Sequence, residues 1–122
     1  MDWTRPMAFA TPLLDLTQAQ ALAGEPAGLR ALAESFRDSL QTELQQIDAA
    51  LARDDAQALS FGLHALKGFV PLFCQADLAQ AVTALYHDSR HQDGAATAAR
   101  YRQLAPVLQA LGAEVQAWLG AL

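Results

Sequence analysis

A long apolar stripe is the feature that most limits how this chain can fold. Its members recur at intervals of three and four residues: Leu29, Leu32, Phe36, Leu40, Leu44, Ile47 and Leu51. Because residues at this spacing share one face of an α-helix, the stripe predicts a long helix with one buried face. That face needs apolar partners, so the rest of the chain must supply further amphipathic helices.

The composition also favours helices over strands. Of the 122 residues, 52% are hydrophobic and 17% are charged. Alanine, leucine and glutamine are abundant, whereas valine, isoleucine and threonine are few. Straight-chain residues lose little side-chain freedom in a helix, while β-branched residues favour strands. The length suits one domain. We therefore expect a single all-α domain.

Capping residues predict where the helices begin and end. Thr17 is expected to cap a short helix over residues 17–22, which Gly24 ends. Pro26 fits the first turn of the long helix, and Asp54-Asp55 separates that helix from the next. Three later helices are expected at about 56–73, 76–91 and 95–119, with Asp93-Gly94 between the last two.

Short links between long helices make sequential helices antiparallel neighbours. We therefore expect an up-down antiparallel four-helix bundle over residues 13–122, with a short extra helix at its amino-terminal end. Residues 1–12 contain two prolines and no clear period, so they are expected to be an irregular lead-in or linker. Pro71 and Pro106 fall inside expected helices, which should be kinked there or end early.

Charge and cysteine content exclude several functions. The formal net charge of −5 disfavours nucleic acid and anionic lipid as partners. Cys74 is the only cysteine, so an internal disulfide and a multi-thiolate metal site are excluded. No apolar run is long enough to span a membrane. These features predict a soluble, cytoplasmic chain without direct membrane contact.

The helix expected at 56–73 carries the candidate reactive residue. On a helical wheel its apolar residues form one side, namely Leu59, Gly62, Leu66, Phe69, Val70 and Phe73. His64 projects nearly opposite them. Lys67, the only lysine, lies one turn later, and Gly68 leaves backbone uncovered beside the histidine. A nucleophile, a cation and open space suit a phosphoryl acceptor, because phosphoryl transfer depends mainly on positioning and charge neutralisation.

The string His64-Ala65-Leu66-Lys67-Gly68 resembles the H-x-L-K-G signature of histidine phosphotransfer (HPt) domains of the bacterial type. Residues 14–16 and 24–25, the long stripe and residues 54–59 resemble the same family, so the likeness covers about residues 13–119. The chain departs from the family after Gly68: bulky residues follow, and Cys74 stands where a glycine is usual. We expect this cysteine to be buried.

The resemblance implies a phosphocarrier rather than an enzyme. It implies a monomeric bundle whose His64 accepts a phosphoryl group, through Nε2, from an aspartate of a receiver domain and passes it to another receiver aspartate. Lys67 would hold the phosphoryl oxygens, and Gly68 would give the receiver access. The receiver would supply Mg²⁺, so the chain itself would bind no cofactor. Its partners would be response-regulator receivers and a sensor histidine kinase, to whose cytoplasmic carboxy-terminal part it could itself belong.

Residues around the histidine are candidates for docking a receiver. An apolar flank beside a polar reactive residue is typical of a protein-binding patch. We expect contacts from Ser60, Phe61, Ala65, Pro71 and Leu72, with Ser60 and Lys67 at the rim. The alternative for Phe61 is that it packs against a neighbouring helix or the amino-terminal segment.

Two other functions remain open. A phosphoacceptor and dimerisation segment of a histidine kinase also presents a helical histidine, but usually with an acidic residue after it, where this chain has Ala65. A helical interaction module would never carry phosphate on His64. His87 and His91 have a spacing that can hold zinc, but no third ligand is evident, so no metal site is expected.

Overall fold

The computed structural model describes residues 7–122, and every regular element in that range is helical. The elements are α1 (Thr17–Ala23), α2 (Pro26–Ala52), α3 (Ala56–Phe69), the 3₁₀ turn η1 (Val70–Leu72), α4 (Ala76–Ser89) and α5 (Gly94–Gly120). Within this described part there is no strand, and the one isolated β-bridge joins Leu14 and Cys74. The predicted all-α class is confirmed.

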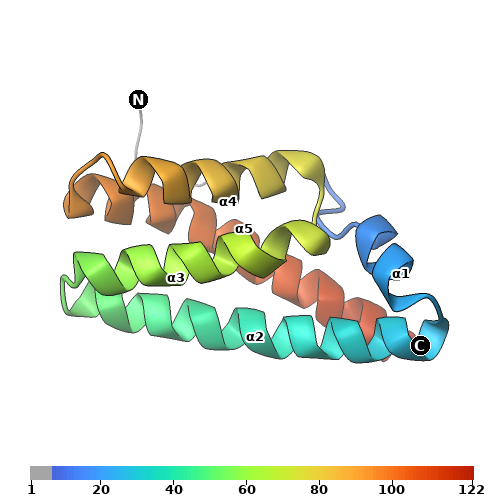
Figure 1. Ribbon diagram of the computed structural model, residues 1–122. Helices are drawn as coiled ribbons and strands as arrows, with labels where there is room; N and C mark the ends of the chain where they lie inside the picture. Colours follow the sequence, from blue (N-terminus) through green and yellow to red (C-terminus); the bar gives the residue numbers. More distant parts are fainter. Residues whose placement is uncertain (1–6) are drawn as a thin grey trace.

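The four longer helices share one apolar core. α2 packs against α3 and α5, and α4 packs against α3 and α5, so the contacts close a ring. Figure 1 shows these helices lying lengthwise together, with α1 across one end near the start of α2. The fully buried large side chains include Leu40, Ile47, Leu63, Leu66, Leu78, Leu85, Leu104, Leu108 and Leu111. The predicted stripe on α2 therefore faces this core.

Most helix ends follow the predicted caps. Gly24 adopts φ +76°, a left-handed conformation that suits glycine, and it ends α1. Asp55 caps α3, and Asp93, which was expected only to separate the last two helices, caps α5: each carboxylate accepts a hydrogen bond from the backbone N–H three residues later. The prediction for Thr17 was wrong. It is the first residue of α1, and its own N–H donates to the Asp15 carboxylate at 2.9 Å.

The two prolines have different effects. α3 ends at Phe69 and the chain continues as the 3₁₀ turn that contains Pro71, so the expected range to residue 73 was too long and the predicted early end at this proline is confirmed. Proline lacks an N–H and its ring clashes with the preceding turn, which accounts for the early end. α5 instead continues through Pro106, which is exposed. The predicted end of α4 at residue 91 was two residues too late, since α4 ends at Ser89.

Hydrogen bonds join the segment before α1 to the helical bundle. Both oxygens of Glu114 on α5 lie 3.0–3.1 Å from the N–H of Leu13, and one also accepts from the N–H of Leu14. The Asp15 N–H donates to the carbonyl of Phe73. Earlier in the chain, the Met7 N–H donates to a carbonyl of α5. Residues 1–6 of the expected lead-in lie outside the described residues.

No helix in residues 7–122 has the length and apolar character needed to cross a membrane.

Candidate functional site

The packing of α3 against α2 determines which face of α3 is exposed. A Cβ placed on Gly62 would overlap Cγ1 of Ile47, so the two helices approach closely only because residue 62 has no side chain. Leu59, Leu63 and Leu66 are buried on the same side of α3. The helical wheel did not include Leu63 in the core. The opposite face of α3 is left to solvent.

His64 lies on that solvent face. Its side chain is exposed, as the helical wheel predicted, and it has no hydrogen-bond partner among residues 7–122. Its imidazole ring packs instead against the ring of Tyr86 on α4, with 5.1 Å between the ring centroids and a tilt of 52°. Both ring nitrogens are thus left without a partner in the described part of the chain, and a second molecule can reach this ring.

Lys67 and Gly68 lie about one helical turn after His64 on α3. The Nζ atom of Lys67 lies 5.2 Å from the centroid of the Tyr86 ring, within the range of a cation–π contact. Gly68 is exposed, and a Cβ built on it would meet nothing within 4 Å. The structure therefore gathers an imidazole, an ammonium group and uncovered backbone on one exposed face of α3.

Tyr86 was missed by the sequence analysis. It is half-buried, and part of it packs against the core. Equal spacing from the turn between α3 and α4 does not identify it: His64 lies five residues before the last residue of α3, whereas Tyr86 lies ten residues after the first residue of α4. The choice of this aromatic residue from several candidates on α4 needed the three-dimensional packing.

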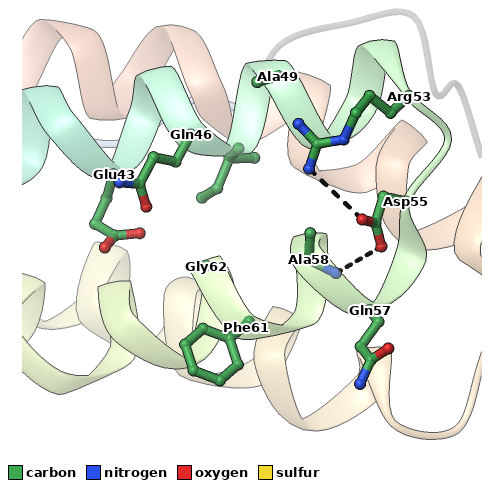
Figure 2. Close-up of a pocket in the computed structure, with 10 residues that line it drawn as sticks. Glu43, Gln46, Ala49, Arg53, Asp55, Gln57, Ala58, Phe61 and Gly62 are labelled. Atoms are coloured by element: carbon green, nitrogen blue, oxygen red, sulfur yellow. Dashed lines mark hydrogen bonds and ion pairs between the residues drawn. The ribbon is translucent and has the colours of Figure 1, made fainter.

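Phe61 is the most exposed aromatic side chain of the described residues. Its exposed fraction is 78%, so it is not packed against a neighbouring helix or against residues 7–16. It borders a groove of about 470 Å³ between α2 and α3, whose floor includes Ile47 and Gly62. Figure 2 shows Glu43 and Gln46 on the α2 side of this groove and Phe61 on the α3 side.

The other docking candidates are less exposed than Phe61. Ser60, Ala65, Pro71 and Leu72 are all half-buried, and part of Leu72 packs on the core. Ala65 lines a second groove between α2 and α3, of about 430 Å³, with Asp38 and Thr42 on its α2 side. Among the docking candidates, Phe61 is therefore the one large apolar side chain that is mostly exposed.

The turn before α3 is held by charge and hydrogen bonding. Figure 2 shows Asp55 between the N–H of Ala58, which donates to it at 3.0 Å, and the guanidinium of Arg53, 3.5 Å away. These two contacts lower the pKa of the Asp55 carboxyl below its usual value, the backbone hydrogen bond more than the arginine. The capping carboxylate is therefore ionised at neutral pH, and α3 begins at a defined position.

The remaining reactive side chains do not assemble into a second site. Cys74 is buried beside Leu14, and burial raises the pKa of its thiol to about 12, so little thiolate forms at neutral pH. His87 and His91 are exposed. Among residues 7–122, no group of three or more histidine, cysteine, aspartate or glutamate side chains is placed to hold a metal ion.

Comparison with known proteins identifies the family. A family model described as Hpt domain matches residues 31–118, which include all of α3 and α4 and most of α2 and α5. Neither a curated protein nor a solved structure matches the chain. The matched range covers most of the chain and contains His64, Lys67 and Gly68. The chain belongs to the Hpt domain family.

Proposed function

We propose that this domain carries phosphoryl groups on His64 between aspartates of receiver domains in a two-component phosphorelay. The observation that supports this most strongly is the exposed imidazole of His64, beside Lys67 and the uncovered backbone of Gly68, in a chain of the Hpt family. Hpt domains act in phosphorelays as phosphocarriers and interact with receiver domains and kinases. That the phosphoryl donor and the phosphoryl acceptor are both receiver aspartates is part of this proposal.

The reaction needs one nucleophile and correct alignment. The Nε2 lone pair of His64 attacks the phosphorus of a receiver aspartyl phosphate, the N–P bond forms, and the P–O bond to the aspartate breaks. The aspartate leaves as a carboxylate, and the proton on Nδ1 of His64 remains there. Transfer to the next receiver reverses these steps with a different carboxylate. Alignment and charge neutralisation contribute most of the rate in such transfers.

Lys67 and Gly68 would assist in different ways. The ammonium of Lys67, one turn from the imidazole, would neutralise charge on the equatorial phosphoryl oxygens. Gly68 leaves space for the receiver loops that surround the aspartate. The Mg²⁺ for the reaction would come with the receiver, and no residue of this chain is assigned to it.

Receiver docking would centre on Phe61. A large apolar side chain that is exposed beside a reactive group is a strong candidate for an interface anchor. Ala65, Pro71 and Leu72 would extend the contact along α3 and η1, with Ser60 and Lys67 at the rim. Phe61→Ala should slow transfer from a receiver while the helical content, followed by circular dichroism, is unchanged. Leu22→Ala is a matched control, since Leu22 is exposed on α1.

The direct test is transfer of labelled phosphate. A phosphorylated receiver is mixed with wild-type protein, His64→Gln or His91→Gln, and acid-labile label on the domain is measured. We expect label on wild type and on His91→Gln, whose exposed histidine lies beyond α4, but none on His64→Gln. Label that persists on His64→Gln, or its absence from wild type, would reject the carrier function and favour a helical interaction module.

The oligomeric state separates the carrier from the kinase segment. We propose that the domain is a monomeric up-down antiparallel bundle, because α2, α3, α4 and α5 close one core within a single chain. A phosphoacceptor segment of a histidine kinase instead dimerises through its helices. Light scattering should give the mass of one chain, and a stable dimer would support the kinase segment. We place the domain in the cytoplasm, with its proposed receiver partners.

A further inference from the structure

One aromatic ring on α4 contacts both reactive groups of α3. The Tyr86 ring lies 5.1 Å from the imidazole of His64, centroid to centroid, and 5.2 Å from Nζ of Lys67. These two residues are one helical turn apart, so their side chains leave α3 at neighbouring points on its surface. Tyr86 comes from the adjacent helix and is the side chain that links them.

The Tyr86 ring is half-buried and held against the core, whereas the imidazole of His64 that it contacts is exposed. A lysine side chain has four rotatable bonds and, in water, samples many positions. Contact between the ammonium and the face of an aromatic ring is attractive at this distance. The contact therefore favours positions of the Lys67 ammonium next to the Tyr86 ring.

We propose that Tyr86 is a positioning residue for phosphoryl transfer: its ring orients the imidazole of His64 and holds the ammonium of Lys67 beside it. The inference rests on the proposed carrier function and extends it to a residue on a second helix. Positioning of this kind raises the rate because less orientational freedom is lost when the reactants meet.

The contacts involve the ring of Tyr86 and not its hydroxyl. The hydroxyl has no hydrogen-bond partner among residues 7–122. Tyr86→Phe keeps the ring and its face, so it should keep the function. Tyr86→Leu keeps an apolar side chain for the core but has no aromatic face. The pair of variants therefore separates aromatic positioning from simple packing.

The first experiment measures the intrinsic reactivity of His64 without a docking partner. The full chain is phosphorylated with phosphoramidate, a small phosphoryl donor, and the rate is followed by mass spectrometry. We expect Tyr86→Phe to react like wild type and Tyr86→Leu to react roughly threefold to tenfold more slowly, the range that one aromatic or cation–π contact supports. Circular dichroism and thermal unfolding of both variants show whether the fold is kept.

A double-mutant cycle tests whether Tyr86 acts through Lys67. In a Lys67→Gln background, Tyr86→Leu should slow the reaction less than it does in wild type, because the contact with the ammonium is already lost. Equal effects in both backgrounds would reject positioning of Lys67. A proton NMR spectrum provides a readout independent of phosphate: ring-current shifts of the His64 ring protons and the Lys67 ε protons should persist in Tyr86→Phe and disappear in Tyr86→Leu.

The outcomes distinguish this inference from the proposed function. A wild-type chain that takes no phosphate on His64 overturns the carrier function, and the positioning role falls with it. A wild-type chain that is phosphorylated while folded Tyr86→Leu reacts equally fast overturns the positioning role alone. A Tyr86→Phe variant as slow as Tyr86→Leu also overturns it, because the hydroxyl would then be the active group.

Discussion

Replacement of Gly68 by alanine should make the domain more stable and a poorer phosphoryl acceptor. Gly68 lies within α3, next to its last residue, and a Cβ there would meet nothing within 4 Å. Alanine is favoured over glycine inside a helix by about 0.5–1 kcal/mol, and a position near the helix end gives the lower part of that range. The midpoint of thermal unfolding should rise by roughly 2–3 °C.

The loss of transfer comes from the same methyl group. It would stand on the exposed face beside His64, where a receiver must approach closely. A displacement of about 1 Å in a reacting pair can reduce the rate by about 10²-fold. We expect Gly68→Ala to reduce transfer from a receiver by at least about tenfold, and Gly68→Gln to reduce it by about 10²-fold or more. Phosphorylation by phosphoramidate should change little, because a small donor does not need the same space.

Rapid-quench measurement of receiver-to-domain transfer, together with thermal unfolding, tests both effects. Gly112→Ala is the matched control. Gly112 lies inside α5, and its Cβ would make an ordinary contact with Leu40 at 3.5 Å. This variant should gain similar stability and transfer at the wild-type rate. The reasoning fails if Gly68→Gln transfers as fast as wild type, or if Gly68→Ala is less stable than wild type.

Three further substitutions test the packing around the site. Gly62→Ala should lower the free energy of unfolding by about 1–3 kcal/mol in denaturant titrations, since its methyl overlaps Ile47, and an unchanged value would argue against the close α2–α3 contact. Glu114→Ala should lower the free energy of unfolding by about 1–3 kcal/mol and speed proteolysis before α1, because the backbone N–H groups at residues 13–14 lose their acceptor. Equal protease resistance of the variant and the wild type would contradict this. In the folded protein the pKa of the Cys74 thiol is raised to about 12, whereas in the unfolded chain it is near 9.0. Above pH 9 the unfolded state therefore releases this proton and the folded state keeps it, so the free energy of unfolding of the wild type should fall as the pH rises. Cys74→Ala should lose less stability over that range, and parallel pH profiles would refute the assignment.

Local rules on the sequence predicted most of the secondary structure. The stripe on α2, the glycine after α1, and the aspartate before α3 are effects of neighbouring residues, so periodicity and capping preferences were enough to find them. The exposed position of His64 followed from the same periodicity. The range expected for α3 ran to residue 73 because the apolar spacing continues past Pro71, although the proline itself indicated a kink or an early end.

By itself, then, the sequence determined which segments are helical, which face of each is apolar, and that His64, Lys67 and Gly68 lie together on one helix surface. Only the tertiary structure decided that Tyr86 lies against two of these groups, that most of Phe61 is exposed, and that Glu114 binds backbone N–H groups far away in sequence. The physical reason is that contacts between helices depend on how closely and at what rotation they pack. Those quantities depend on side-chain volumes across the whole core, such as the absent side chain of Gly62 over Ile47.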